Sequence, residues 1–413
     1  MVQIAVLGHG VVGSGVVEVF FKNRDSIMKK ANCEMDIKYI LDLREFPESP
    51  VADRFTKDFN VILNDPEIRV VVELMGGLHP AYDFVKSCML SGKSVVTSNK
   101  ELVATCGAEL LAIAKEKKVS FMFEASVGGG IPIIRPIHQC LAANEIKEIA
   151  GILNGTTNFI LTKMIKEKMD FEPALALAQS LGYAERNPAA DVEGQDACRK
   201  ICILSSLAFG KHVYPNEVHT EGITKISLKD IEYIASWGGV IKLIARAKKL
   251  ENSKLFVSVS PAALTKESQL SGVDDVFNGI LVRGDAIGDV IFYGKGAGKL
   301  PTASAVVADI IDAVKHIGTY KYFFWSEGEK GYVSDYLEMS DELYFRVSAA
   351  HQQSAIKRIN QLFGDVKVID LGKKDGEFAF ITKSTNYGEA KQAVGCLEED
   401  GISVLSQIPI LDY

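Results

Sequence analysis

The chain opens with the apolar run VQIAVL, residues 2–7, and continues directly into GHGVVG, residues 8–13. A short run rich in β-branched residues predicts a buried strand, and residues 14–21 have the spacing of a helix. The three glycines fit G-x-G-x-x-G, in which the backbone approaches a pyrophosphate and the following helix offers its N–H groups to the phosphates. We therefore predict a strand, a dinucleotide-binding turn at Gly8, Gly10 and Gly13, and a helix.

Further strand-like runs follow this motif and alternate with helical patterns. The helical patterns lie at Ala81–Ser91 and Ala108–Lys117, and the strand-like runs lie at Ile37–Leu41, Val70–Leu74, Ser94–Thr97 and Val119–Phe123. Such alternation implies parallel strands joined by right-handed crossovers. We expect residues 1–130 to form a Rossmann-type, doubly wound parallel sheet that binds NAD or NADP.

The rest of the chain predicts two further units. Residues 131–318 mix helical patterns such as Ala197–Phe209 with strand-like runs such as Phe256–Pro261, which indicates an α+β substrate and dimerisation domain. The end of this domain, about residues 294–318, is expected to return to the cofactor domain. Residues 319–340 are interpreted as a linker whose aromatic residues, including Tyr320 and Tyr322, suggest packing, and residues 341–413 have the βαββαβ order of a ferredoxin-like unit.

The composition excludes several classes of protein. The chain has 413 residues, of which 47% are hydrophobic and 24% are charged, and its formal net charge is −7. No run approaches the roughly 18 apolar residues of a membrane helix, and no signal peptide is expected. The seven cysteines form no Cys-x-x-Cys pair, which favours free thiols in a reducing cytoplasm. An acidic chain without a basic run disfavours nucleic acid and leaves a small molecule as the expected partner.

Two charged residues near the end of the second predicted strand leave the choice of coenzyme open. An acidic residue at the position of Asp42 would bond the adenosine ribose hydroxyl and disfavour a 2′-phosphate, which is typical of NAD. Arg44 could instead receive that phosphate, and Asp42 would then be a solvated loop charge. The sequence mildly favours NAD over NADP.

The run that ends at Thr97 is followed by Ser98-Asn99-Lys100, at the edge where open α/β sheets bind ligands. Lys100 could reach a substrate or the nicotinamide, and an ordinary surface lysine is the alternative. Two glycine-rich loops also allow two interpretations each. EASVGGGIP, residues 124–132, could offer oxygens to a monovalent cation or could be a plain strand-end loop. GKGAG, residues 294–298, either folds back to the cofactor or only begins a helix.

A short, turn-rich segment concentrates charge before a predicted helix. It reads LGYAE at residues 181–185 and DVEGQDACRK at residues 191–200. Asp196 and Lys200 are four apart, so on a helix they share one face and could form an ordinary surface pair. If that face closes a cleft opposite the nicotinamide, the acidic residues would grip a cationic amino group while a lysine donates a proton to a developing alkoxide. Hydride transfer needs such an acid, because the cofactor supplies no proton.

With these residues the chain resembles the homoserine dehydrogenase family, in the form that carries a C-terminal ACT-like domain, over essentially its whole length. The matching signature consists of Ala178, Gly182-Tyr183-Ala184, Asn187-Pro188, Asp191-Val192, Gly194, Asp196 and Lys200, and GILNGTTN at residues 151–158 is also typical of the family. The resemblance implies reversible oxidation of L-homoserine to L-aspartate 4-semialdehyde with NAD(P), in the biosynthesis of threonine, methionine and isoleucine.

The resemblance also implies roles for the matched residues. Lys200 would donate the proton to the carbonyl oxygen, directly or through a water, with Lys100 beside substrate and nicotinamide and Asp191 as electrostatic support. The residues expected to hold the substrate are Glu185, Asp196, Gly182, Tyr183, Asn154 and Thr156. Together with the glycine motif, the residues expected at the cofactor are Gly8, Gly10, Val11, Val12, Gly13, Asp42, Thr97, Lys100 and Gly298.

An ion, an oligomer and an effector are implied in the same way. A structural sodium ion would be held by Glu124 and by the backbone of Val127, Gly129 and Ile131. The subunits would form a homodimer or homotetramer through strands of the second domain. ACT domains often bind an amino acid such as threonine at a turn with an acidic residue and Pro-Gly, but this chain has AAHQQS at residues 349–354. Threonine feedback and a purely structural or dimerising role therefore both remain open.

Two other functions compete with this interpretation. A dehydrogenase for another amino-acid aldehyde would share the fold, but the matched substrate segment argues against it. A non-catalytic amino-acid sensor belongs to a different class, and the intact Lys100, Asp196 and Lys200 argue against it.

Overall fold

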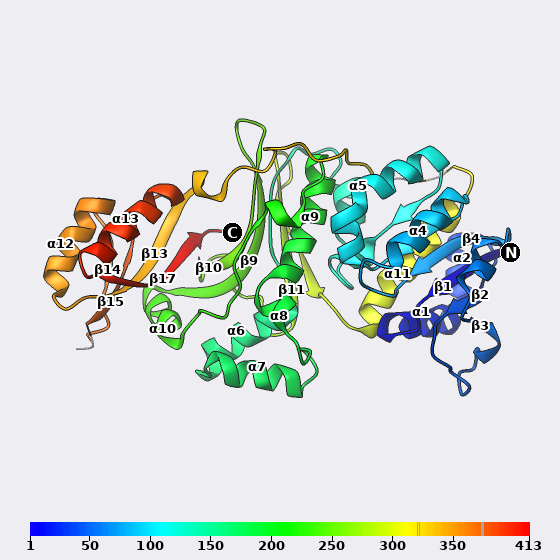
Figure 1. The fold of residues 1–413 in the computed structure, drawn as a ribbon, viewed down its shortest axis with the longest axis horizontal. Coiled ribbons are helices and arrows are strands. Elements are labelled where there is room, and N and C mark those ends of the chain that lie inside the picture. The colour runs from blue at the N-terminus through cyan, green and yellow to red at the C-terminus, as the bar shows by residue number, and fades with distance from the viewer. Residues whose placement is uncertain (320, 322, 373–375) are drawn as a thin grey trace.

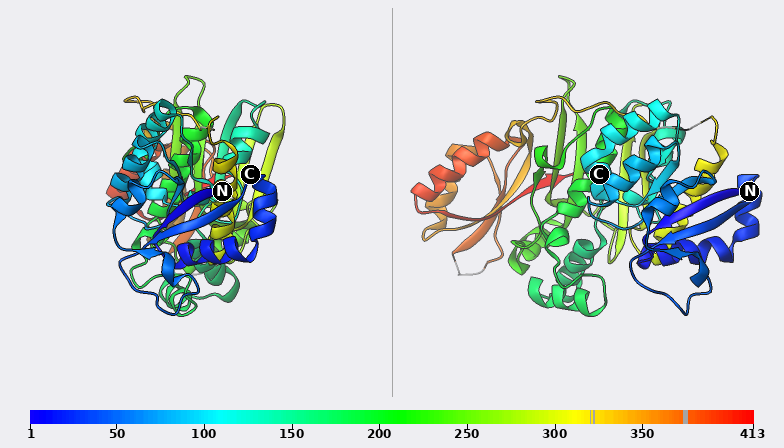
Figure 2. Two further views of the ribbon diagram at one scale, coloured as in Figure 1. Left: turned by 90° about the vertical axis from the view of Figure 1, so that its right-hand side faces the viewer. Right: turned by 45° about the vertical axis from the view of Figure 1, so that its right-hand side comes forward.

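The computed structural model describes residues 1–319, 321, 323–372 and 376–413. Three parts follow one another along the long axis (Figures 1 and 2): an N-terminal sheet with its helices, a central sheet, and a C-terminal unit in orange and red. The C-terminus lies near the middle of the molecule (Figure 1), because the last strand runs back to the central sheet. The predicted linker includes residues 320 and 322, which lie outside the described residues.

The N-terminal sheet is parallel throughout, as the alternating pattern predicts. Its strand order is β3-β2-β1-β4-β5-β6. The strands are β1 (Val2–Leu7), β2 (Met35–Leu41), β3 (Phe55–Thr56), β4 (Ile68–Glu73), β5 (Ser94–Thr97) and β6 (Phe121–Met122). The order reverses between β1 and β4, and ligands of doubly wound sheets bind at the carboxyl ends of strands at such a point.

Helices cover this sheet. They are α1 (Val11–Lys22), α2 (Arg24–Ala31), α3 (Phe59–Leu63), α4 (Ala81–Leu90), α5 (Lys100–Lys117) and α11 (Lys299–Lys315). Although α11 comes late in the chain, it packs against α1, α2, β4 and β5. The sequence pattern predicts α5 only from Ala108, because Gly107 interrupts it, but the helix begins at Lys100 with Asn99 as its N-cap. Lys100 therefore lies in the first turn of α5, at the ligand edge of the sheet.

The central domain is built on long antiparallel strands. The order β12-β11-β7-β9-β10 is formed by β7 (Ile146–Ile152), β9 (Gly239–Lys249), β10 (Leu255–Thr265), β11 (Phe277–Gly284) and β12 (Gly288–Lys295), and β8 (His219–Thr220) pairs with β10. The helices are α6 (Gly155–Glu167), α7 (Phe171–Ser180), α8 (Ala189–Val192), α9 (Gln195–Phe209) and α10 (Leu228–Trp237). Of these, α6, α9 and α10 pack on β9. The sequence analysis missed β12, which lies at the sheet edge and has no buried residue.

The C-terminal unit has the order β13 (Ser340–Ser348), α12 (Gln352–Phe363), β14 (Lys367–Ile369), β15 (Glu377–Ile381), β16 (Thr385–Asn386), α13 (Tyr387–Glu399) and β17 (Ser403–Leu411). Its strands are arranged β17-β13-β15-β14, all antiparallel, which is the connectivity of a ferredoxin-like unit. The unit does not have a separate sheet. The end of β17 pairs with β10 at Ile410 and Leu411, so that one 11-stranded sheet runs through both domains.

A buried ion-pair cluster joins α10 to the C-terminal unit. Arg346 on β13 donates from Nε to Asp230 Oδ1 at 2.8 Å and from Nη1 to Glu377 Oε2 at 2.8 Å. Lys229 also pairs with Glu377, at 2.7 Å. Asp230 is fully buried, so its charge depends on Arg346 for compensation. We call these residues the arginine cluster.

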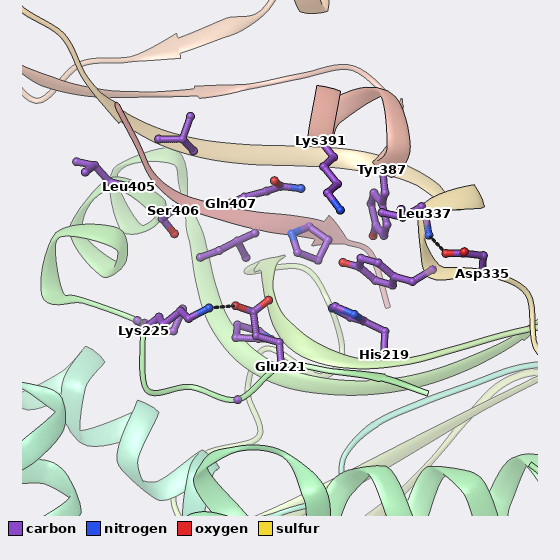
Figure 3. A pocket seen from close by; sticks show the side chains of 17 residues that line it. His219, Glu221, Lys225, Asp335, Leu337, Tyr387, Lys391, Leu405, Ser406 and Gln407 are labelled. Atoms are coloured by element: carbon purple, nitrogen blue, oxygen red, sulfur yellow. Dashed lines mark hydrogen bonds and ion pairs between the residues drawn. The ribbon is translucent and has the colours of Figure 1, made fainter. Parts of the chain in front are cut away.

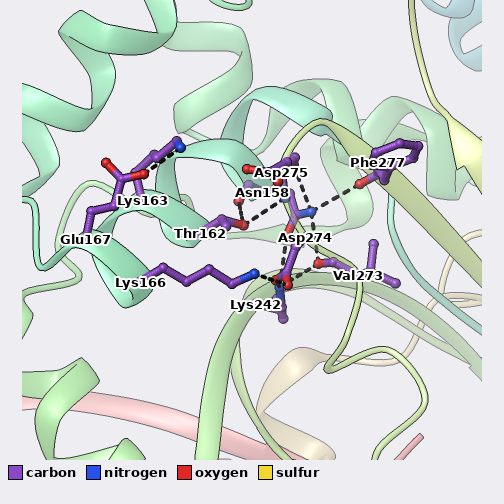
Figure 4. Close-up of polar contacts among 10 residues, drawn as sticks. All are labelled: Asn158, Thr162, Lys163, Lys166, Glu167, Lys242, Val273, Asp274, Asp275 and Phe277. Carbon is purple, nitrogen blue, oxygen red and sulfur yellow. Dashed lines mark hydrogen bonds and ion pairs between the residues drawn. The ribbon is translucent and has the colours of Figure 1, made fainter.

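A second polar cluster fixes the loop that enters β11 (Figure 4). The side-chain amide of Asn158 donates to the carbonyls of Val273, Asp275 and Phe277 at 3.0–3.1 Å. The buried Lys242 of β9 donates to Asp274 Oδ1 at 3.0 Å and to the Val273 carbonyl. Because Asn158 lies on α6, these bonds hold the N-terminal half of α6 against the central sheet.

The segment that links the central domain to the C-terminal unit packs on the protein. Phe323 and Trp325 are buried, and Trp325 Nε1 donates to His212 Nδ1 at 2.9 Å. Across the described ranges, no helix has both the length and the apolar content that a membrane crossing requires.

Candidate active site

The glycine turn joins the carboxyl end of β1 to the start of α1. Gly8 has a φ of +96°, and a Cβ on Gly13 would collide with the Gly8 carbonyl oxygen, so the turn closes only with glycine at these positions. Around Gly10 there is open space, and Val11, the first residue of α1, is 69% exposed. Free N–H groups at an open helix N-terminus suit a pyrophosphate.

A cavity of about 470 Å³ adjoins this turn. Its walls come from the ends of β1, β2 and β4 and from the start of α4, and they include Gly8, Gly10, Asp42, Met75 and Pro80. The volume lies in the range of small-molecule sites. The residues present therefore fit one end of a dinucleotide.

Asp42 and Arg44 bind each other at the end of β2. Arg44 donates from Nε to Asp42 Oδ1 at 2.9 Å and from Nη2 to Oδ2 at 2.8 Å, and the His9 N–H donates to Oδ2 at 2.8 Å. The Arg44 guanidinium holds the pKa of Asp42 well below its usual range. The two residues that the sequence offers for opposite coenzymes thus form one bidentate pair, with the Arg44 side chain 62% exposed.

A buried carboxylate that the sequence analysis missed lies at the ligand edge of the sheet. Glu73, the last residue of β4, accepts a hydrogen bond from Thr97 Oγ1 at 2.6 Å and from the Met75 N–H at 2.8 Å. Burial raises the pKa of Glu73. Thr97 is itself buried and accepts from the Asn99 N–H at 2.9 Å. Thr97 therefore supports the turns at the ligand edge of the sheet. The sequence feature that could have identified Glu73 is a carboxylate at the end of an apolar strand.

Two lysines share one carboxylate where the cofactor domain meets the central domain. Lys100 at the start of α5 forms an ion pair with Asp196 Oδ1. Lys200, one turn along α9 from Asp196, donates to Asp196 Oδ2 at 2.7 Å and to the Leu153 carbonyl at 2.8 Å. A second contact, from Arg199 Nη2 to Glu101 Oε1 at 3.1 Å, also joins α9 to α5. We call Lys100, Asp196 and Lys200 the lysine cluster.

Asn154 connects the lysine cluster to Asp191. Its Nδ2 donates to Asp191 Oδ1 at 2.7 Å and to Asp196 Oδ2 at 2.8 Å. Its Oδ1 accepts from the Thr157 N–H at 2.8 Å, which makes Asn154 the N-cap of α6. The amide of Asn154 is thus fully engaged in positioning the two carboxylates.

The charged groups of the lysine cluster differ in burial and in the charges around them. Burial works against the charged form of Lys200, with Lys100 adding repulsion, and together they outweigh Asp196 and lower the pKa of Lys200. Lys100 is 41% exposed at its side chain, and Asp196 and Asp191 outweigh its desolvation and raise its pKa. Asp196 is buried, but the two lysines hold its pKa below the usual range. Burial, reinforced by Asp196, raises the pKa of Asp191.

The other predicted substrate residues lie on a surface loop after α7. Gly182, Tyr183 and Glu185 are exposed, and the Glu185 carbonyl accepts from Gln179 Nε2 at 3.1 Å. Thr156 Oγ1 donates to the Tyr183 carbonyl at 2.7 Å, which fastens this loop to the first turn of α6. The structure therefore brings the loop to the helix that carries Asn154, but it records no contact between Glu185 and the lysine cluster within the described chain.

The glycine-rich loop after β6 is tied to the end of β12. Glu124 is buried, and its carboxylate accepts from the N–H groups of Ile133, Ile134 and Arg135 at 2.6–2.9 Å. Glu124 therefore has little side-chain capacity left for an ion. Among the described residues, the carbonyls of Val127, Gly129 and Ile131 accept no hydrogen bond, so the backbone remains able to hold a cation.

Asp309 of α11 holds this loop by a hydrogen bond and an ion pair. It accepts from the Glu124 N–H at 2.8 Å and pairs with Arg135 Nη1 at 3.1 Å, and burial raises the pKa of Asp309 to about 7. The Gly130 N–H donates to the Lys295 carbonyl at 3.2 Å, which places the loop at residues 294–298 beside it. Gly298 is the N-cap of α11, and Lys299 pairs with Glu18 of α1 at 2.7 Å. The second glycine loop thus returns to the cofactor domain.

The chain matches known proteins over nearly all of its length. The profile described as "Homoserine dehydrogenase, NAD binding domain" matches residues 8–124, and that described as "Homoserine dehydrogenase" matches residues 132–311. The homoserine dehydrogenase of Bacillus subtilis (strain 168) is 39% identical over 370 residues, which cover 88% of this chain and 85% of the relative.

Solved structures agree with these matches. The crystal structure of a homoserine dehydrogenase from Thiobacillus denitrificans has a TM-score of 0.90 and 33% identity, covering 100% of this chain and 98% of that one. A hyperthermophilic archaeal homoserine dehydrogenase in complex with NADPH has a TM-score of 0.65 and 26% identity, covering 78% of this chain and 99% of that one.

Proposed function

This chain belongs to the homoserine dehydrogenase family and is an NAD(P)-dependent oxidoreductase that acts on a CH–OH group, and we propose how its residues carry out that reaction. The reaction is the reversible conversion of L-homoserine to L-aspartate 4-semialdehyde, run physiologically as aldehyde reduction in the biosynthesis of threonine, methionine and isoleucine. The observation that carries the proposal is the lysine cluster, in which Lys100 and Lys200 share Asp196.

Lys200 is the proton donor. The bound nicotinamide supplies or accepts the hydride, and the protein handles the proton. In aldehyde reduction, Lys200 Nζ gives a proton to the carbonyl oxygen, and in homoserine oxidation the neutral amine takes the hydroxyl proton. The lowered pKa of Lys200 supports this role, because a shift toward the operating pH makes the ammonium group a stronger acid and leaves more of the neutral amine available as a base.

Asp196 and Lys100 hold Lys200 in place and set its charge. Asp196 fixes Nζ from one side, and the Leu153 carbonyl fixes it from another. Lys100 stays protonated because its pKa is raised, so it contributes a permanent positive charge beside the substrate oxygen. Asp191 acts through Asn154, which orients both carboxylates.

The substrate amino group is a cation and needs a carboxylate. Lys100 and Lys200 already pair with the two oxygens of Asp196. We therefore assign Glu185, on the loop after α7, as the main partner of the substrate ammonium group and Asp196 as the second partner. Gly182 and Tyr183 shape that loop, and Thr156 and Asn154 anchor it and the helix behind it.

The glycine turn would hold the cofactor. Gly8, Gly10, Val11, Val12 and Gly13 would hold its pyrophosphate, and Asp42 its adenosine ribose. Thr97, Lys100 and Gly298 would border its nicotinamide end. NAD and NADP both fit, because Asp42 and Arg44 neutralise each other. A sodium ion at the backbone of Glu124, Val127, Gly129 and Ile131 would be structural, since hydride transfer does not require it.

The remaining assignments concern the whole assembly. The C-terminal unit is ACT-like on the basis of its βαββαβ order, and it serves an amino-acid effector such as threonine. The protein acts in the cytoplasm as a homodimer or homotetramer, with strands of the central domain pairing between subunits. The exposed edge strand β12 supports such pairing.

The experiment that tests the proposed function follows nicotinamide absorbance during incubation with L-aspartate 4-semialdehyde, with NADH and NADPH in parallel and with or without L-threonine. Oxidation of either coenzyme, with homoserine as the product, is the expected result. Cofactor binding without oxidation would contradict the proposal and favour another aldehyde or a sensor.

A further inference from the structure

The last residue of β4 is a glutamate without solvent access. Glu73 is fully buried and lies where the strand order of the N-terminal sheet reverses. No lysine or arginine of the described ranges forms an ion pair with it. Burying a carboxylate costs free energy unless hydrogen bonds compensate it. The hydrogen-bond partners of Glu73 therefore decide what it does at this point of the sheet.

The two oxygens of Glu73 join the ends of two neighbouring strands. Oε1 accepts from the N–H groups of Met75 and Gly76, at 2.8 and 3.3 Å, in the turn that follows β4. Oε2 accepts from Thr97 Oγ1 at 2.6 Å, at the end of β5. All three partners donate, so both oxygens must be acceptors. A carboxylate meets this condition, whereas the amide of glutamine has only one acceptor oxygen.

Asn99 closes a ring of hydrogen bonds around this carboxylate. Its N–H donates to Thr97 Oγ1 at 2.9 Å, and its Nδ2 donates to the Gly77 carbonyl at 2.6 Å. Its Oδ1 accepts from the Leu102 N–H at 3.1 Å, which makes Asn99 the N-cap of α5. Lys100 follows directly, so the ring fixes the first turn of the helix that carries it. We call Glu73, Thr97, Asn99 and the turn at residues 75–77 the Glu73 ring.

The turn of the Glu73 ring faces open space beside the glycine turn. Gly76 and Gly77 have φ values of +76° and +71°, and a Cβ on either would meet no heavy atom within 4 Å. Met75 lines the cavity of about 470 Å³ together with Gly8 and Gly10. The turn therefore lies between the residues that would hold the pyrophosphate and the first turn of α5. Two successive left-handed glycines leave backbone that a flat ligand is able to approach closely.

We propose that Glu73 is a positioning residue that holds the turn at residues 75–77 and Lys100 against the nicotinamide half of the cofactor. Because Glu73 has no exposed surface, it acts only through the Glu73 ring. The adenosine half would depend on the glycine turn and on Asp42, which lie outside the ring. The inference rests on the proposed function, because it takes Lys100 to lie beside the nicotinamide. A carboxylate that only stabilised the sheet would not affect one half of the cofactor selectively.

The test compares Glu73→Gln with the unmodified full chain. Glutamine keeps the size of the side chain but has one acceptor fewer, so it opens the ring. We expect kcat for reduction of L-aspartate 4-semialdehyde to fall by about 10–10²-fold, since a misplacement of about 1 Å is able to cost that much. Calorimetric titration should show weaker binding of NADPH but unchanged binding of 2′-phospho-ADP-ribose, which lacks only the nicotinamide.

Two results would overturn the proposal. A folded Glu73→Gln variant with the kcat and the NADPH affinity of the unmodified chain would show that the ring does not position the site. An equal loss of affinity for NADPH and for 2′-phospho-ADP-ribose would show a general disturbance of the cofactor domain.

Asn99→Ser tests the ring at a second bond. Serine is a good N-cap, so α5 should keep its start, but serine has no amide to donate to the Gly77 carbonyl. We expect kcat to fall again, while the urea unfolding midpoint stays near that of the unmodified chain. This variant also decides the proposal if Glu73→Gln does not fold, and an unchanged kcat would then overturn it.

Two carboxylates away from the ring provide matched controls. Asp36 lies near the start of β2, at the opposite end of the same sheet, and pairs with Arg54 at 2.9 Å. Glu221 lines a charged cavity of about 610 Å³ that β17 and α13 border on one side, and Lys391 also lines it (Figure 3). Asp36→Asn and Glu221→Gln should keep kcat and the NADPH affinity. An equal fall of kcat in these controls would show that loss of any such carboxylate has this effect, and would overturn the proposal.

The activity of the unmodified chain separates this inference from the proposed function. If the unmodified chain does not reduce L-aspartate 4-semialdehyde, the proposed function fails. The affinities for NADPH and for 2′-phospho-ADP-ribose still decide the role of the Glu73 ring in that case, because they do not depend on turnover.

Discussion

The lysine cluster and the arginine cluster are each built around a buried aspartate, and they differ in the cation that holds it. Asp196 is bound by Lys100 and Lys200, whereas Asp230 is bound by Arg346, supported by Glu377 and Lys229. A buried lysine is able to change its protonation state, but arginine stays charged at any working pH. The first cluster therefore suits proton transfer, and the second suits permanent docking of one domain on another.

The largest effect is expected at Lys200. Lys200→Met should lower kcat by about 10²–10⁴-fold, because a general acid typically contributes that much. Steady-state NADPH oxidation measures the loss, and fluorescence titration should show that NADPH still binds. Lys242→Met is the matched control, since Lys242 is also a buried lysine of the central domain but bonds Asp274. An equal loss of kcat in both variants would show that burial of a lysine, and not its place beside Asp196, determines the rate.

Arg346→Met should act on stability instead of chemistry. It leaves Asp230 buried without its partner, and breaking such a pair typically costs about 3–5 kcal/mol of unfolding free energy. Urea denaturation followed by circular dichroism measures the loss. The folded variant should keep the kcat of the unmodified chain.

The double variant Asp230→Asn/Arg346→Met sharpens this prediction. Because it also removes the orphaned charge, it should recover part of the lost stability. A drop in kcat without a drop in stability would contradict the structural role of the arginine cluster.

Lys100→Met should move the pH profile of Lys200. Aldehyde reduction needs protonated Lys200, so its rate falls as pH rises through the pKa of Lys200. Lys100 lowers that pKa by repulsion, and its removal should raise it. The alkaline limb of the kcat profile for reduction should therefore shift to higher pH. A limb that stays in place or shifts to lower pH would show that Lys100 does not set the charge of Lys200.

The smallest effect is expected at the pair of Asp42 and Arg44 at the end of β2. Arg44→Met would free the Asp42 carboxylate, which favours a ribose hydroxyl over a 2′-phosphate. The ratio of kcat/KM for NADH to that for NADPH should rise, by less than about tenfold, because the Arg44 side of the ion pair is exposed to solvent, which weakens it. Asp42→Asn should change the ratio in the opposite direction, and a matching change in both variants would contradict this explanation.

Local patterns predicted the N-terminal sheet well. The run at residues 2–21 placed a strand, a turn and a helix in the right order, because alternation and glycine spacing are properties of neighbouring residues. The same approach predicted α5 too late and missed β12. Gly107 lowers the helix propensity within α5, and no residue of the edge strand β12 is buried, so the local sequence signal for both elements is weak.

The site shows the same division between neighbouring and distant residues. The four-residue spacing of Asp196 and Lys200 predicted that they share a helix face, and the structure joins them at 2.7 Å. The spacing did not show that the Asn154 amide donates to Asp191 and Asp196, nor that Thr97 donates a hydrogen bond to Glu73. Those bonds join residues far apart in the chain, and one sequence carries no record of such distances.

The sequence by itself determined the strand–turn–helix of the cofactor domain, the βαββαβ order of the C-terminal unit and the residues that form the lysine cluster. The tertiary structure decided which partners those residues contact. It brought Lys100 of α5 to Asp196 of α9, paired Asp42 with Arg44, and ran β17 beside β10 to leave a charged cavity. The physical reason is that secondary structure follows from local periodicity, whereas burial, charge pairing and pKa depend on which distant segments pack together.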